Sequence, residues 1–162
     1  MTSSTDPSVL LAVEGGRGTI TLNRPSAMNA LTLPMIRAIR GALAAFERDP
    51  AVRFVTIDSA REGVFCAGGD IRGIREARLA GRHDAADDFF AEEFALNLAI
   101  ARCAKPYIAL IDGICMGGGV GLAVHGTHRV VSDLLVMAMP ETAIGYFPDV
   151  GASFFLNALP PG

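Results

Sequence analysis

An α/β fold is predicted for this chain of 162 residues, because strand-like segments alternate with helix-like segments along most of its length. Apolar residues make up 51% of the chain, which is enough for a hydrophobic core, and the length fits one compact domain. Charged residues make up only 19%, so part of the surface is expected to be covered by something else. We expect a flexible tail over residues 1–8 and one domain over residues 9–162.

The first half of the chain predicts a hairpin, a helix and a strand. Two β-prone runs, 9–13 and 19–22, flank a glycine-rich turn and are typical of a hairpin. Thr32 can cap a helix whose apolar residues recur every three or four positions and which ends near Asp49 and Pro50. Residues 54–57 form an apolar run of strand length, followed by a predicted loop over 62–69.

The second half predicts helices and strands in alternation. Residues 73–104 favour two helices separated at Gly81 and Arg82, and 106–111 is another apolar run of strand length. A glycine-rich loop over 112–121 leads into a helix that continues towards Gly126. Two short strands, 129–131 and 135–137, and a last helix over 150–159 complete the predicted order.

Composition excludes several classes of function. A net charge of −3 and a single lysine, Lys105, argue against nucleic-acid binding, which needs clustered cations. No apolar run has the length of a membrane span, and the first residues carry no secretory signal. The histidines and cysteines lack metal-binding spacing, so no metal is expected. Three cysteines without a CxxC pair favour reduced thiols, and hence a cytoplasmic protein.

Two glycine loops stand where a strand gives way to a helix. The triplet 117–119 could expose backbone N–H groups that bind a phosphate or a developing oxyanion, although tight packing between strand and helix explains it equally well. A phosphate loop would need a Gly-Lys-Ser/Thr sequence, which is absent. The second loop, 65–71, ends in Asp70, which a helix-capping role explains. One N–H group from each loop could hold one carbonyl oxygen.

Carboxyl groups in apolar surroundings are the remaining candidates. Glu141 and Asp149 could be an acid/base pair, but taken alone they are better explained as helix caps. Glu92 and Glu93 interrupt a phenylalanine-rich run; a solvated helix face is favoured for Glu92, whereas either interpretation stays open for Glu93.

Together these segments resemble the crotonase superfamily, also called the enoyl-CoA hydratase/isomerase family. The resemblance rests on the order and spacing of Leu22-Asn23-Arg24-Pro25, Phe65-Cys66-Ala67-Gly68-Gly69-Asp70-Ile71 and Asp112-Gly113 with Met116-Gly117-Gly118-Gly119. It implies a superhelix of stacked ββα turns, in which 9–162 is the N-terminal catalytic core and a C-terminal helical part is missing from this chain. It also implies an acyl-CoA substrate, with CoA as part of the substrate and no other cofactor.

Within the superfamily, residues 139–151 resemble the hydrolases that act on 3-hydroxyisobutyryl-CoA in valine breakdown. The resemblance implies a catalytic set of Gly69, Gly118, Glu141 and Asp149, and a set of Ala67, Asp70, Ile71 and Glu93 that binds substrate or CoA. The thioester oxygen would accept hydrogen bonds from the N–H groups of Gly69 and Gly118. Glu141 would be the nucleophile or the base that activates water, and Asp149 would bind the 3-hydroxyl group or shuttle protons. Backbone at positions 67, 70 and 71 would lie against the adenine side of CoA.

Two other functions stay open at this stage. One is a hydratase or isomerase with Glu141 alone as acid/base, although the second acidic position of the hydratases is Gly121 here. The other is a non-catalytic acyl-CoA-binding module. We further expect either a homo-oligomer or a partner chain that covers an apolar patch near Phe154, Phe155 and Leu156, and no nucleic-acid or membrane partner.

Overall fold

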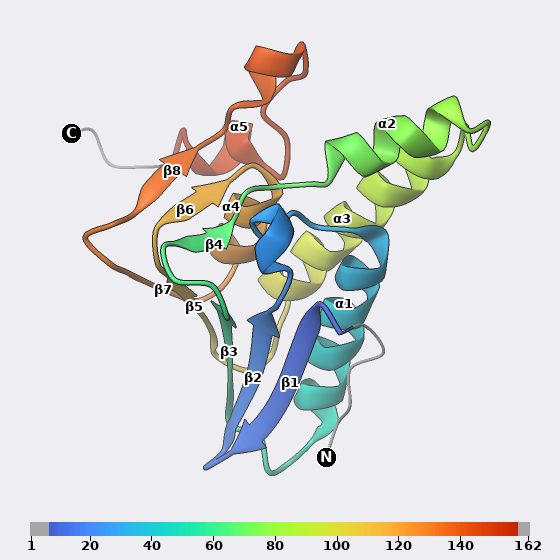
Figure 1. Ribbon diagram of the computed structural model, residues 1–162. Helices are drawn as coiled ribbons and strands as arrows, with labels where there is room; N and C mark the ends of the chain where they lie inside the picture. Colours follow the sequence, from blue (N-terminus) through green and yellow to red (C-terminus); the bar gives the residue numbers. More distant parts are fainter. Residues whose placement is uncertain (1–6, 159–162) are drawn as a thin grey trace.

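The computed structural model describes residues 7–158, in which eight strands form two sheets flanked by helices (Figure 1). Strands β1 (Val9–Glu14) and β2 (Arg17–Leu22) form the predicted antiparallel hairpin. β2 then pairs in parallel with β3 (Phe54–Ser59), which continues through β5 (Tyr107–Ile111) to β7 (His128–Val131). The larger sheet therefore has the order β1-β2-β3-β5-β7.

A second, smaller sheet consists of three short parallel strands in the order β4-β6-β8. These are β4 (Val64–Cys66), β6 (Ile114–Met116) and β8 (Val136–Ala138). Each follows a strand of the larger sheet and precedes a helix, so the chain winds through successive ββα turns. This arrangement confirms the predicted superhelix.

Strands β4 and β6 correct the sequence prediction, which placed loops at 62–69 and 112–121. Each strand is only three residues long, so it is too short to show a periodic pattern, and glycines surround both. Pairing with neighbouring turns, which a local pattern does not report, makes these residues strands.

The helices of the first two turns pack side by side. α1 (Leu33–Arg48) begins as predicted at Thr32, whose hydroxyl accepts a hydrogen bond from the N–H of Met35. α2 (Ile71–Leu79) and α3 (Ala85–Ala101) form a hairpin that extends beyond the sheets (Figure 1). Arg37 and Arg40 of α1 form ion pairs with Glu92 of α3 at 3.2 and 2.7 Å, so Glu92 joins two helices and does not lie on a fully solvated face.

The remaining helical segments are short. A 3₁₀ turn, η1 (Pro25–Ala27), follows β2, and α4 (Gly118–Val124) follows β6. After β8 come η2 (Glu141–Ile144) and α5 (Ala152–Phe155). Within residues 7–158, no helix is long and apolar enough to cross a membrane.

The predicted last helix over 150–159 is wrong in its start and length. Gly151, with a φ of +84°, precedes the first helical residue, and only four residues are helical. The Asp149 carboxylate makes no capping hydrogen bond to this helix, so the capping interpretation of Asp149 is also wrong. Residue 159 lies outside the described residues. So do residues 1–6 of the predicted tail, while the carbonyls of Pro7 and Ser8 accept hydrogen bonds from Asn23.

Candidate active site

The two glycine loops meet between successive turns of the superhelix. A Cβ added to Gly68 would lie 3.2 Å from the carbonyl oxygen of Met116 and 3.6 Å from the nitrogen of Gly118. A Cβ added to Gly117 would lie 3.7 Å from the Cα of Gly68. Gly68 and Gly117 both have positive φ, at +105° and +49°, so glycine suits these positions for its backbone freedom as well as for its size.

Two backbone N–H groups at this junction are available to a ligand. Those of Gly69 and Gly118 donate to no acceptor within residues 7–158. The first loop is braced on either side, because Leu31 donates to the carbonyl of Gly68 and accepts from Asp70, each at 2.8 Å. Gly69 and Gly118 line the same cavity, of about 760 Å³. Their N–H groups therefore have the fixed, unpartnered state that a carbonyl or oxyanion site needs.

Three carboxyl groups line this cavity together with the glycines. Glu93 comes from α3, Glu141 begins η2, and Asp149 lies in the loop before α5. Oε1 of Glu93 and Oε2 of Glu141 are buried, and neither has a hydrogen-bond partner among the residues that the structure describes. A buried polar atom without a partner is costly unless a ligand or water satisfies it.

The carboxyl groups lie directly against the second glycine loop. A Cβ on Gly118 would collide with Oε1 of Glu93, and one on Gly117 would lie 2.7 Å from Oε1 of Glu141. The absence of side chains at these two positions therefore lets both carboxyls approach the backbone. Tight packing and an anion-binding role, which the sequence left as alternatives for this loop, are compatible in the structure.

Burial and nearby negative charges favour the protonated forms of Glu93 and Asp149. Burial raises the pKa of Glu93 to about 8, and the charges of Asp149 and Glu141 add to the effect. The pKa of Asp149 is also raised, first by burial and then by Glu141. Near neutral pH the Glu93 carboxyl can therefore hold a proton and donate it within the cavity, which suits an acid/base role.

The aromatic side chains of Phe90 and Tyr146 also line the cavity. Phe90 of α3 stacks on Tyr146 with ring centroids 5.5 Å apart, and Tyr146 contacts Phe147 at 4.6 Å. These contacts join α3 to the segment that carries Glu141 and Asp149. Phe90 precedes Glu93 by three positions on one helix, a spacing that could have indicated a shared face.

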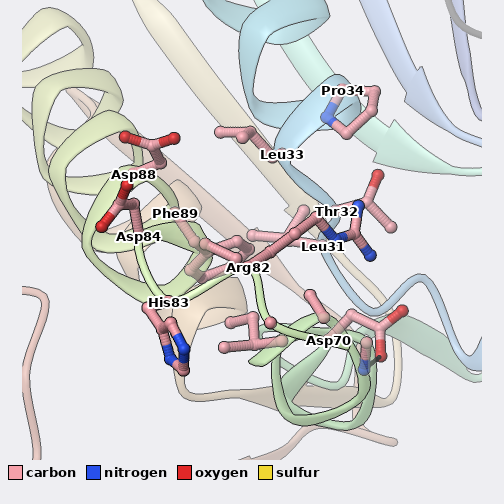
Figure 2. Close-up of a pocket in the computed structure, with 15 residues that line it drawn as sticks. Leu31, Thr32, Leu33, Pro34, Asp70, Arg82, His83, Asp84, Asp88 and Phe89 are labelled. Carbon is pink, nitrogen blue, oxygen red and sulfur yellow. Dashed lines mark hydrogen bonds between the residues drawn. The ribbon is translucent and has the colours of Figure 1, made fainter. Parts of the chain in front are cut away.

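Of the predicted CoA-binding residues, Ala67 and Ile71 line this cavity, whereas Asp70 does not. Asp70 lies at a second cavity, of about 680 Å³, together with Thr32 and Arg82 (Figure 2). Its carboxylate accepts a hydrogen bond from the N–H of Gly73 at 3.0 Å and forms an ion pair with Arg24 at 2.8 Å. The capping interpretation of Asp70 is therefore confirmed. In the part of the chain that the structure describes, no group of three or more His, Cys, Asp or Glu residues could hold a metal ion.

Stacked ββα turns with two glycine loops over one cavity define the crotonase class of fold. Solved structures agree: a carnitinyl-CoA dehydratase from Mycobacterium thermoresistibile matches with a TM-score of 0.90 and 46% identity, over 96% of this chain and 45% of that one. An enoyl-CoA hydratase from Rhodobacter sphaeroides 2.4.1 matches with a TM-score of 0.89 and 43% identity, over 94% of this chain and 45% of that one. The chain belongs to the enoyl-CoA hydratase/isomerase family, which matches residues 17–162.

Curated relatives are more specific in their names. The mitochondrial 3-hydroxyisobutyryl-CoA hydrolase of Xenopus laevis is 55% identical over 154 residues, which cover 95% of this chain and 40% of that protein. The hydrolase of the same name from Homo sapiens is 53% identical over 161 residues, covering 98% of this chain and 42% of that protein. The chain thus spans about two fifths of the length of these relatives.

The expected cytoplasmic location is contradicted by these relatives, which are named as mitochondrial proteins. The expectation rested on unpaired cysteines, which indicate a reducing compartment without indicating which one.

Proposed function

We propose that the protein hydrolyses an acyl-CoA thioester, with 3-hydroxyisobutyryl-CoA, an intermediate of valine breakdown, as its substrate. The observation that carries the proposal is the convergence of two unpartnered N–H groups and three carboxyls on one cavity. The relatives named 3-hydroxyisobutyryl-CoA hydrolase support this choice of substrate.

In the proposed reaction, the N–H groups of Gly69 and Gly118 form an oxyanion hole. They hold the thioester oxygen as negative charge develops on it. Backbone donors suit this role because the loops that carry them are braced and need not reorganise during the reaction. The hydrogen bonds between Leu31 and the first loop provide that bracing.

Glu141 acts on the thioester carbonyl carbon, either directly as a nucleophile or by taking a proton from an attacking water. In the first route the carboxylate displaces the CoA thiolate and forms a mixed anhydride, which water then hydrolyses to the free carboxylic acid and Glu141. In the second route the water oxygen adds to the carbonyl carbon and the C–S bond breaks, so that the acyl group leaves as a carboxylic acid. In both routes the CoA thiolate takes up a proton. Asp149 binds the 3-hydroxyl group or carries that proton. Glu93 contacts the substrate and, where protonated, can donate a hydrogen bond to it.

The proposed chemistry uses no cofactor, because CoA enters as part of the substrate. Its adenine side lies against the backbone of Ala67, Asp70 and Ile71. Of these, Ala67 and Ile71 line the cavity that contains the carboxyls.

The test is to replace Glu141 by Gln, which keeps the shape of the side chain but removes its charge and its nucleophilic oxygen. If Glu141 is the nucleophile or base, kcat falls roughly a hundredfold or more with little change in KM. Release of free thiol from 3-hydroxyisobutyryl-CoA measures the rate. Thermal unfolding checks that the variant is folded, since a purely structural Glu141 would lower stability without lowering kcat per folded molecule. A stable variant with the parent rate would refute the assignment.

The same assay separates the alternative functions. The solved relatives titled hydratase and dehydratase make the hydratase or isomerase activity the second candidate. That activity would consume the enoyl absorbance of an unsaturated thioester without releasing thiol. A non-catalytic acyl-CoA-binding module would bind CoA without either change.

We also propose that the apolar face formed by Phe147, Phe154 and Leu156 is covered by a second copy of this chain in the working assembly. The side chains of Phe147 and Phe154 are 63% and 79% exposed, and Leu156 is 44% exposed, whereas Phe155 packs partly against the core. Phe147 and Leu156 line one cavity, and Phe154 lies two positions before Leu156 in the chain, so exposed apolar side chains are concentrated here and favour association. A partner chain is the competing occupant, and the oligomeric state distinguishes the two.

A further inference from the structure

Tyr146 is a polar side chain of the carboxyl-lined cavity to which the proposed reaction gives no part. It lines that cavity together with Glu93, Glu141 and Asp149. Within residues 7–158, its hydroxyl group makes no hydrogen bond. The hydroxyl is therefore available to a ligand that enters the cavity.

Contacts that do not involve this hydroxyl hold Tyr146 in place. Its ring stacks on Phe90 of α3, with centroids 5.5 Å apart and ring planes 17° from parallel. Its backbone N–H donates to the carbonyl of Glu141 at 3.1 Å, which closes the turn that carries Glu141. The hydroxyl is thus presented by a ring whose position does not depend on it.

Tyr146 supplies a hydrogen-bond donor beside groups that accept. Burial raises the pKa of Tyr146, and the charges of Asp149, Glu93 and Glu141 add to the effect, so the hydroxyl keeps its proton at neutral pH. Among the three carboxyls, Asp149 influences it most. An ionised carboxylate only accepts hydrogen bonds, whereas a phenol hydroxyl donates one. Glu93 donates only until the pH rises through about 8, so Tyr146 is the more lasting donor.

We propose that Tyr146 determines specificity for a 3-hydroxyacyl group by donating a hydrogen bond to the oxygen of the substrate's 3-hydroxyl. This inference rests on the proposed function, with Asp149 accepting a hydrogen bond from that same hydroxyl. A hydroxyl group can donate once and accept twice, so a donor and an acceptor side by side satisfy it better than an acceptor alone. A site built in this way disfavours an analogue that lacks the hydroxyl, because the polar groups of the site then stay unpaired.

The experiment replaces Tyr146 by Phe, which removes the hydroxyl and keeps the ring that stacks on Phe90. Thiol release is measured from 3-hydroxyisobutyryl-CoA and from isobutyryl-CoA, which is the same thioester without the 3-hydroxyl group. We expect kcat/KM for the hydroxylated substrate to fall roughly tenfold and kcat/KM for isobutyryl-CoA to stay unchanged. The preference for the hydroxylated substrate therefore falls by the same factor.

Tyr107→Phe is the matched control. Tyr107 is the other tyrosine of the chain, and its hydroxyl is also without a partner in the described residues, but it is buried in the core and lines none of the cavities described here. Its replacement should leave both rates unchanged.

Three outcomes would overturn the assignment of Tyr146 while the proposed function stands. They are a wild type without preference for the hydroxylated substrate, a Tyr146→Phe variant that keeps the wild-type preference, and a variant that loses rate equally on both substrates. If the wild type releases thiol from neither thioester, the proposed function fails and this inference fails with it.

Discussion

At the scale of single residues, Glu93 links the stability of the protein to its proposed chemistry. Burial holds the pKa of Glu93 at about 8, compared with about 4.5 when the carboxyl is solvated. Between these two values the folded protein retains a proton that the unfolded chain has lost. Stability from this group is thus fully present below about pH 4.5 and is lost as the pH rises through 8.

Replacing Glu93 by Gln should reduce the decrease of stability with rising pH. Between about pH 5 and pH 8, we expect the wild-type Tm to fall and the variant's Tm to fall less, leaving the variant higher by roughly 3–6 °C at the upper end. Asp149, whose pKa is raised in the same direction, accounts for the slope that remains. Calorimetric scans across this pH range check the expectation. Glu76→Gln, at an exposed position on α2, should keep the wild-type slope. If Tm falls equally steeply with pH in the wild type and in the Glu93→Gln variant, the expectation for Glu93 is wrong.

Residue types and spacing alone left the main site residues ambiguous. Glu93 was open between surface and site, and capping was favoured for Asp149, because capping is a local property that a sequence reports directly. The Glu93 carboxyl lies against Gly118, which is 25 residues later in the chain and adjacent only after folding. The resemblance to the crotonase family supplied what local patterns could not. The structure places seven of its eight residues on one cavity, while the site roles themselves stay predictions.

At the scale of elements, the Asp112-Gly113 pair joins consecutive turns of the superhelix. The Asp112 carboxylate accepts hydrogen bonds from the N–H of Gly63 at 2.8 Å and from the hydroxyl of Ser132 at 2.5 Å. The pair therefore ties the loop before β4 to the loop after β7. Gly113 has a φ of +71°, and a Cβ there would overlap the backbone of Gly63.

Gly113→Ala should accordingly destabilise the protein strongly. Gly15→Ala is the matched control, because Gly15 also has a positive φ, +59°, but open space around it. We expect the control to cost about 1 kcal/mol of backbone strain and Gly113→Ala to cost at least about 2 kcal/mol more. Urea unfolding of both variants measures the difference. Equal losses would mean that the approach to Gly63 does not constrain this position.

The longer elements were predictable and the shortest were not. The hairpin has β-prone runs around a glycine-rich turn, and α1 and α2 have one apolar face and a side-chain cap each. α3 has neither a clear apolar face nor a side-chain cap, and its alanine-rich composition indicated it. β4 and β6 exist because they pair with neighbouring turns, so only a family resemblance could anticipate them. The prediction for α5 was wrong in the opposite sense. Its apolar residues suggested a longer helix, but Gly151 precedes the first helical residue, so the helix begins late.

At the scale of the whole molecule, the exposed face at Phe147 and Phe154 should control self-association. We expect Phe147→Ser with Phe154→Ser to shift the protein towards monomer, because the change removes apolar area from that face. Light scattering at several concentrations measures the shift. Leu79→Ser, which changes a 72% exposed residue on α2, should leave the association unchanged. A wild-type chain that is monomeric at every concentration would exclude a second copy as the covering partner.

The pairing of β4 with β6 has a consequence for the distance between the two proposed oxyanion donors. Cys66 and Cys115 are partners in the register of these strands, and each donor glycine follows its cysteine by three residues. Gly69 and Gly118 therefore lie at equivalent places beyond the ends of paired strands in successive turns, and this pairing, with an interstrand spacing of roughly 4.8 Å, brings the two loops together. That spacing is a property of backbone hydrogen bonding and is insensitive to side chains. Point substitutions around the cavity should thus leave the positions of the two proposed oxyanion donors unchanged, whereas inserting one residue into either loop should displace one of them.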